Sequence, residues 1–150
     1  MGVKRVTPEE AKELLESGSG WVYVDVRTVA EFEGGHVPGA KNVPVFVPDA
    51  YGRMCPNADF VLVVRNNFGL GAKIITGCQM GGRSLRAAEL LTSSGFGSVI
   101  DMRGGIGGEM DALGRVTFPG WASRGLPSTV ESQPEDRYAS LKTNTAKPEK

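Results

Sequence analysis

The sequence predicts an α/β domain with a mainly parallel central sheet flanked by helices on both faces. The first indication is a series of short strand-like runs, most of them rich in β-branched or aromatic residues, at 21–26, 41–44, 73–76 and 98–102. The second is that segments with helical spacing of apolar residues separate these runs. Such alternation is typical of parallel strands joined by right-handed crossovers.

A first helix is predicted over residues 8–17. Thr7 and Glu10 form a capping-box pattern around its first turn, and Pro8 is suited to the first helical position. Glycines then end the helix before the strand at 21–26.

The same pattern recurs after that strand. Thr28 and Glu31 form a second capping box, which predicts a short helix that stops at the glycine pair 34–35. The Pro-Gly pair within 36–40 predicts a turn, and 41–44 is then expected to form a short strand ended by proline.

Two further helices are predicted after residue 56. Asn57 is expected to cap one that runs through Phe60 and Phe68. The other covers residues 84–91 and follows the strand at 73–76 after a short loop.

That short loop carries the candidate functional residues. They are Cys78, Gln79, Met80, Gly81, Gly82, Arg83 and Ser84. A helix N-terminus has unpartnered N–H groups and a partial positive charge, so this loop is suited to an anion. Arg83 and Arg86 add cations where acidic residues are usual. Because cations and helix N-termini favour a thiolate, we predict that Cys78 is an activated nucleophile; the alternative is a small buried apolar side chain.

The composition argues against several classes of function. The 150 residues include 17 basic and 17 acidic side chains, so no global field favours nucleic acid or an anionic membrane surface. No segment approaches the ~20 apolar residues of a membrane span. Two cysteines and the single His36 form no metal-binding pattern. We expect a cytoplasmic protein, or an organellar one after removal of a targeting segment.

Three places within residues 3–127 together carry a resemblance to a known family. Segment 23–44 contains an Asp-Val-Arg sequence and a Gly-His-Val-Pro-Gly turn. Residues 78–83 form a six-residue loop that begins with cysteine and contains paired glycines. The glycine pair 104–105 is followed later by the tryptophan and Gly-Leu-Pro of 121–127. The chain thus resembles a single-domain rhodanese, a sulfurtransferase of the thiosulfate type.

The resemblance implies a reaction through a covalent sulfur intermediate. Cys78 would take a sulfane sulfur from a donor such as thiosulfate and become a persulfide, which a thiol or cyanide acceptor would then remove. The amides from Gln79 to Ser84 and the guanidinium of Arg83 would hold the persulfide anion. No metal or organic cofactor is implied, and thioredoxin or glutathione is a candidate partner.

Two features depart from the family pattern. Gln79 follows the cysteine, where many thiosulfate-preferring members have a cation, so the donor stays open. Extra residues near 110–121 separate the glycine pair from the tryptophan. We expect this insertion to place Asp111, Arg115 or Phe118 at the rim of the site, because loops on a rigid scaffold commonly set ligand access.

Other conspicuous side chains have structural interpretations. His36 lies in a Pro-Gly turn and is expected to form structural hydrogen bonds. Asp25 and Arg27 are expected to form a charged pair that fixes loop geometry, with a further role of Arg27 at the site left open. Cys55 is interpreted as a plain loop cysteine in preference to a resolving thiol. Arg86 either stands at the pocket entrance or lies on the helix surface.

Two other functions stay open at this point. A phosphatase or arsenate reductase on the same fold would wrap its cysteine loop around a tetrahedral oxyanion. Phosphatase loops of that kind are longer than the four residues between Cys78 and Arg83. A non-catalytic binding module is the other alternative, but such modules often lose the cysteine that this chain keeps. Sulfur transfer is therefore the favoured interpretation.

The chain is predicted to form one rhodanese-like domain over residues 1–127. Residues 128–150 are rich in Ser, Thr, Glu, Lys and Pro and contain few apolar side chains. Because such a composition buries too little surface to order a segment, we expect a flexible C-terminal tail.

Overall fold

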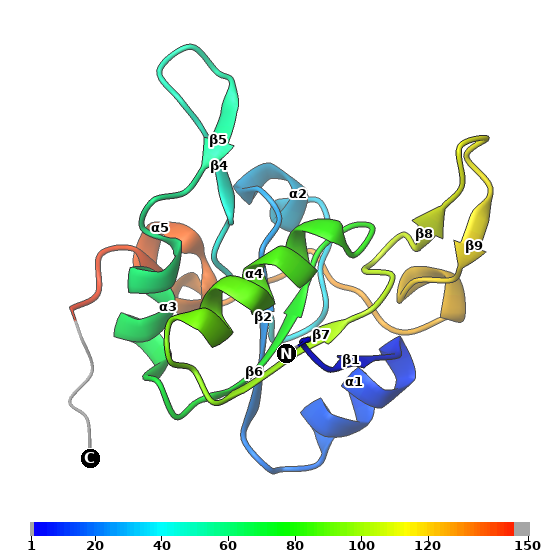
Figure 1. Ribbon diagram of the computed structural model, residues 1–150, viewed down its shortest axis with the longest axis horizontal. Helices are drawn as coiled ribbons and strands as arrows, with labels where there is room; N and C mark the ends of the chain where they lie inside the picture. Colours follow the sequence, from blue (N-terminus) through cyan, green and yellow to red (C-terminus); the bar gives the residue numbers. More distant parts are fainter. Residues whose placement is uncertain (1, 146–150) are drawn as a thin grey trace.

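A five-stranded sheet lies at the centre of the computed structural model, which describes residues 2–145 (Figure 1). All its strands are parallel, in the order β1-β7-β6-β2-β3. They are β1 (Arg5–Val6), β2 (Trp21–Asp25), β3 (Lys41–Asn42), β6 (Lys73–Gly77) and β7 (Ser98–Met102). The predicted α/β class is confirmed, and each strand expected from the sequence is part of this sheet.

Helices cover both faces of the sheet. They are α1 (Pro8–Glu16), α2 (Val29–Glu33), α3 (Phe60–Phe68), α4 (Gly82–Ser93), α5 (Tyr138–Leu141) and the 3₁₀ turns η1 (Ala122–Arg124) and η2 (Pro134–Asp136). One buried cluster joins the sheet to α3, α4 and α5. The other joins the opposite face to α1 and α2. No helix within residues 2–145 is long and apolar enough to cross a membrane.

Two capping boxes start α1 and α2, as predicted. The Thr7 hydroxyl accepts a hydrogen bond from the Glu10 N–H at 3.1 Å, and the Glu10 carboxylate accepts one from the Thr7 N–H at 2.8 Å. Thr28 and Glu31 form the same reciprocal pair at 3.2 and 3.0 Å. Each box satisfies backbone donors that a helix start leaves without partners.

Asn57 does not cap α3, contrary to the prediction. The N-cap residue is Asp59, and the Asn57 side-chain oxygen accepts a hydrogen bond from the Asp59 N–H at 3.0 Å. Asparagine commonly closes a local turn in this way. The Asn57 amide nitrogen donates to the Pro44 carbonyl and to the Tyr138 hydroxyl. Asn57 therefore links the start of α3 to the C-terminal segment.

Two antiparallel hairpins that the sequence did not predict project from the body (Figure 1). The first pairs β4 (Phe46–Pro48) with β5 (Met54–Pro56). The second pairs β8 (Glu109–Met110) with β9 (Val116–Phe118) and accounts for most of the insertion expected near 110–121. Strands this short offer too few positions for an alternating pattern to be recognised.

Residues 128–145 pack against the domain, which differs from the flexible tail expected there. The backbones of Thr129 and His36 exchange hydrogen bonds, and Lys41 forms an ion pair with Asp136. Leu141 is buried in the same cluster as α3 and α4. The segment is anchored by a few residues such as Leu141, and its composition, which is mostly polar, gave no sign of them. Residues 146–150 of the expected tail lie outside the described residues.

Candidate active site

The candidate loop lies between the end of β6 at Gly77 and the start of α4 at Gly82, at the carboxyl edge of the parallel sheet. Gly81 has a φ of 105°, a conformation that suits glycine. A Cβ there would also approach within 3.1 Å of the Gly104 nitrogen. The tight turn therefore requires glycine at this position, because the loop lies close to the backbone of Gly104, which follows β7.

The sulfur of Cys78 lies inside this turn. It accepts hydrogen bonds from the Gly81 N–H at 3.1 Å and the Ser84 N–H at 3.3 Å. These are the kind of unpartnered donors that a helix start offers to an anion. Cys78 is 1% exposed and adjoins the apolar cluster beneath α4, but its sulfur faces polar N–H groups. The interpretation of Cys78 as a plain apolar side chain does not account for these donors.

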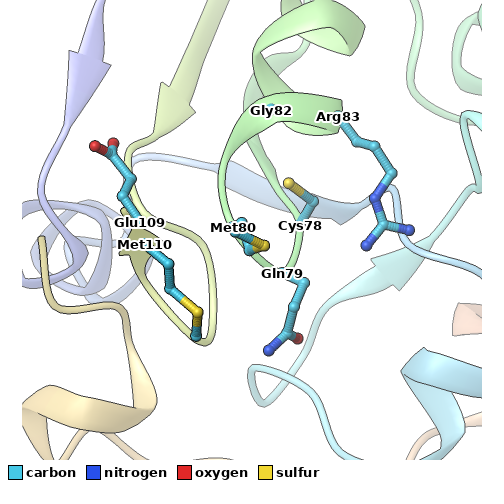
Figure 2. A pocket seen from close by; sticks show the side chains of 7 residues that line it. All are labelled: Cys78, Gln79, Met80, Gly82, Arg83, Glu109 and Met110. Atoms are coloured by element: carbon cyan, nitrogen blue, oxygen red, sulfur yellow. The ribbon is translucent and has the colours of Figure 1, made fainter. Parts of the chain in front are cut away.

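Cys78 also lines an open cavity of about 590 Å³. Its lining residues come from the loop, the start of α4 and strand β8, and they are Cys78, Gln79, Met80, Gly82, Arg83, Glu109 and Met110 (Figure 2). The nearly buried Cys78 therefore lies at the wall of a cavity that has room for a small molecule. Within residues 2–145, no cluster of His, Cys, Asp or Glu could hold a metal ion.

Arg83 is paired with Glu31 of α2. Its two terminal nitrogens donate to the two carboxylate oxygens at 2.7 and 3.0 Å. This bidentate bond, with smaller contributions from Thr28, lowers the pKa of Glu31 to about 2, although partial burial opposes the shift. Arg83 lines the cavity, but here the amides of Gly81 and Ser84, and not its guanidinium, are the donors to the sulfur.

Asp25 and Arg27 form the charged pair that the sequence suggested, and both are buried. The Asp25 carboxylate accepts from the Arg27 backbone N–H and from its guanidinium at 2.8 to 3.2 Å. The terminal nitrogen Nη2, which donates to Asp25, also donates to the Gly35 carbonyl at 2.7 Å. The other terminal nitrogen, Nη1, reaches the side-chain oxygen of Gln79 at 3.5 Å. Arg27 thus touches the site through Gln79, without reaching the sulfur.

The backbone of the loop is held by the segment 104–108, which follows β7. The carbonyls of Cys78 and Gln79 accept hydrogen bonds from Ile106 and Gly107 at 2.9 and 2.8 Å. A Cβ at Gly105 would overlap the carbonyl oxygen of Cys78. The glycines of this segment therefore let two backbones lie in direct contact, which fixes the position of Cys78.

A buried carboxylate supports the loop from the strand side. Asp101, at 0% exposure, accepts hydrogen bonds from Arg5 and from the Thr76 hydroxyl, both at 3.0 Å. Burial raises the pKa of Asp101, while Ser84, Arg5 and Thr76 act in the opposite direction. Arg5 also donates to the Gly81 carbonyl at 3.5 Å. Strand β1 thereby ties the loop to the sheet.

Several residues considered from the sequence lie away from this cavity. Arg86 is exposed and lines a separate hollow beside α3, so it does not stand at the entrance. Asp111 and Arg115 pair with each other in the hairpin turn, and Phe118 lies under the guanidinium of Arg103. The insertion does reach the rim, but through Glu109 and Met110 at its base.

Two other residues have structural roles. Both ring nitrogens of His36 lie within hydrogen-bond distance of carbonyl oxygens, at 2.7 Å from Phe32 and 3.0 Å from Glu131. Cys55 is a free cysteine in β5, and its thiol donates to the Val47 carbonyl. No disulfide joins it to Cys78.

Four residues of the site were not predicted from the sequence: Glu31, Asp101, Glu109 and Met110. Glu31 was recognised only as part of a capping box. That pattern is complete with Thr28 alone, so it did not indicate a pairing with Arg83. Asp101 lies at the carboxyl end of a predicted strand, as functional side chains in parallel sheets commonly do. Glu109 and Met110 belong to no sequence motif that would indicate a role at the site.

The chain is similar in sequence to known proteins. The family model described as "Rhodanese-like domain" matches residues 7–108. The chain is 42% identical over 110 residues to "Thiosulfate sulfurtransferase 16, chloroplastic" of Arabidopsis thaliana, covering 73% of this chain and 81% of that protein. It is 34% identical over 122 residues to thiosulfate sulfurtransferase GlpE of Pseudomonas fluorescens, covering 81% and 94%.

A solved structure extends the likeness to three dimensions. The crystal structure of Rv0390 from M. tuberculosis superposes with a TM-score of 0.71 at 28% identity, covering 87% of this chain and 100% of that one. The matched family region contains four of the five strands of the central sheet, all except β1, together with the Cys78 loop and α4. The chain therefore belongs to the rhodanese-like domain family.

Proposed function

We propose that this protein is a sulfurtransferase that moves a sulfane sulfur from a donor such as thiosulfate to a thiophilic acceptor through a persulfide on Cys78. The observation that carries the proposal is the position of the Cys78 sulfur, which accepts two backbone N–H groups at the floor of an open cavity. Donors of this kind stabilise a thiolate and, after transfer, the negative charge of a persulfide.

The reaction has two displacement steps. In the first, the Cys78 thiolate attacks the outer sulfur of thiosulfate; a Cys78 S–S bond forms, the donor S–S bond breaks, and sulfite leaves with the bonding electron pair. In the second, a thiolate or cyanide attacks the terminal sulfur of the persulfide. The acceptor leaves as a persulfide or thiocyanate, and the Cys78 thiolate is regenerated.

The start of α4 offers donors for the additional sulfur atom. The N–H groups of Gly82 and Arg83 lie in its first turn, where no carbonyl one turn earlier in the helix is available to them. Both residues line the cavity. These amides are suited to accept the charge of the terminal sulfur as it forms. As acceptors we propose small thiols such as glutathione, or a protein thiol such as that of thioredoxin.

The rival functions fit this geometry less well. A phosphatase or arsenate reductase requires its loop to surround a tetrahedral oxyanion. Here the amides of Gly81 and Ser84 are directed at the sulfur atom itself. A non-catalytic binding module needs no such donors around a cysteine.

The intact mass of the protein tests the proposal. After incubation with thiosulfate or mercaptopyruvate, the protein is expected to gain the mass of one sulfur atom, and cyanide or a thiol should remove it. Cys78→Ser should gain nothing. Cys55→Ser is the matched control, because it removes the other cysteine, and it should gain the sulfur normally.

The proposal is wrong if no sulfane donor adds sulfur to the native protein, or if the added sulfur is found on Cys55. Release of phosphate from a phosphoester, or thiol-dependent reduction of arsenate, in a protein that takes up no sulfur would favour the corresponding rival.

A further inference from the structure

Cations near the Cys78 cavity are already neutralised. Arg83 is bound by both oxygens of Glu31, as described above. Arg27 is bound by Asp25 beneath Gln79. Gln79 itself is neutral, and its side-chain oxygen faces Arg27. An incoming anion therefore finds backbone N–H groups at the floor of the site, but no cation without a carboxylate partner among the described residues that line it.

The rim of the cavity carries a carboxylate that is paired with an arginine. Glu109, at the base of the β8–β9 hairpin, is a lining residue. Its carboxylate accepts two hydrogen bonds from Arg103, at 2.8 and 3.2 Å, and this bond lowers the pKa of Glu109. The carboxylate is thus ionised at neutral pH, and its negative charge cancels the positive charge of Arg103. The rim offers no net attraction to a doubly charged molecule.

The same rim exposes apolar surface. Met80 is 47% exposed and Met110 is 45% exposed, and both line the cavity. Figure 2 shows them on the loop and on the hairpin, around the opening that leads to Cys78. Methionine side chains adapt to irregular apolar groups and make favourable contacts with aromatic rings. An apolar substituent on a donor would remove this surface from water.

We propose that the cavity selects singly charged organic sulfane donors with an apolar substituent, of the thiosulfonate type, over the inorganic dianion thiosulfate. This inference rests on the proposed sulfur transfer at Cys78. Thiosulfate must give up the hydration of two charges to enter, and only the amides of the loop replace it. A thiosulfonate brings one charge to those amides and places its substituent against Met80 and Met110.

With such a donor, sulfur transfer to Cys78 is a single displacement. The Cys78 thiolate attacks the outer sulfur of R–SO₂–S⁻ and forms the Cys78 persulfide. The donor S–S bond breaks, and the sulfinate R–SO₂⁻ leaves with the electron pair. No oxidant or reductant is needed beyond the donor, and the total charge is unchanged.

Three sulfur donors distinguish the effect of the donor's charge from the effect of its apolar surface. Benzenethiosulfonate and methanethiosulfonate have the same charge and the same reacting group but differ in apolar surface, whereas thiosulfate carries the second charge. The rate of sulfur addition to Cys78 is measured by intact mass for each donor. Each rate is divided by the rate of the same donor with a free thiol, which removes differences in intrinsic reactivity. We expect the benzene compound to exceed the methane compound about tenfold, and thiosulfate to be slowest.

Two variants assign these preferences to residues. Met110→Ala should reduce the ratio of the benzene to the methane compound several-fold. Glu31→Gln keeps the capping pattern but removes the charge that neutralises Arg83. It should raise the thiosulfate rate about threefold relative to methanethiosulfonate. Leu113→Ala, at the 77% exposed tip of the same hairpin, is the control and should change neither ratio.

The outcomes distinguish this inference from the function on which it rests. If thiosulfate is the fastest donor after normalisation, or if Met110→Ala and Glu31→Gln change all three rates alike, the selectivity is overturned while sulfur transfer stands. If no donor adds sulfur to Cys78, the proposed function fails, and this inference fails with it.

Discussion

The Cys78 loop and the β8–β9 hairpin border the same cavity but are held in place in different ways. The backbone carbonyls of Cys78 and Gln79 accept hydrogen bonds from the distant segment 104–108. The hairpin turn is closed by Asp111 and Arg115, which are four residues apart in sequence and pair with each other near its tip. The floor of the site is therefore fixed by tertiary contacts, whereas much of its rim depends on local ones.

The largest expected difference between the two regions comes from their glycines. Gly105 and Gly114 both have positive φ, 63° and 80°. A side chain at Gly105 would overlap the backbone of Cys78, whereas nothing lies within 4 Å of a Cβ at Gly114. Gly105→Ala should lower the free energy of unfolding by about 3 kcal/mol and slow persulfide formation more than tenfold, because the loop must move.

Gly114→Ala is the matched control. It should cost about 1 kcal/mol, the strain of a left-handed conformation for alanine, and leave persulfide formation unchanged. Urea denaturation and sulfur loading followed by mass measure both effects. Equal losses in the two variants would mean that the segment 104–108 does not hold the loop.

A smaller difference is expected between the ion pairs of the two regions. Glu31→Ala removes both a helix cap and the partner of Arg83. The Glu31 side chain is 34% exposed, so solvent screens the pair, and we expect a loss of about 1 kcal/mol in the free energy of unfolding. Asp111→Ala breaks the exposed pair with Arg115 and should destabilise the protein less. A greater loss for Asp111→Ala in urea denaturation would contradict this comparison.

The smallest expected effect is a dependence on pH. The pKa of Glu31 is lowered from 4.5 to about 2 in the folded protein, chiefly by Arg83. A carboxyl with a depressed pKa contributes stability above its unfolded pKa and loses it as the pH falls through the folded value. The stability advantage of the wild type over Glu31→Gln should thus be full at pH 7 and disappear between about 4.5 and 2. Denaturation curves measured across this range would refute the assignment if the advantage grew toward acid.

Much of the fold follows from local patterns in the sequence. The capping boxes at Thr7 and Thr28 were readable because each is complete within four residues of chain. The turn at Cys78 was readable because glycines follow a strand and precede a helix. The two hairpins and the docked segment 128–145 were not predicted, because their strands are very short and their anchors are single residues such as Leu141.

The site was predictable only where its residues lie close together in the sequence. Cys78 and the amides around it lie in one loop, so sequence alone brought them together. The pairing of Arg83 with Glu31 needs α2 to approach α4, and no pattern in either helix specifies that approach. Met110 joins the cavity only because a hairpin folds back toward the loop. The charge balance of the site is therefore a tertiary property, and the sequence misleadingly suggested a free cation.

The most direct test of the central claim compares the two cysteines of the native protein. We propose that the Gly81 and Ser84 N–H groups, which donate to the Cys78 sulfur beside an open cavity, make Cys78 the reactive cysteine. Labelling with iodoacetamide at neutral pH, followed by peptide mass analysis, gives the rate at each cysteine. We predict that Cys78 reacts at least about tenfold faster than Cys55, although Cys78 is the more buried. Labelling of Cys55 first, with Cys78 modified only after denaturation, would contradict the account.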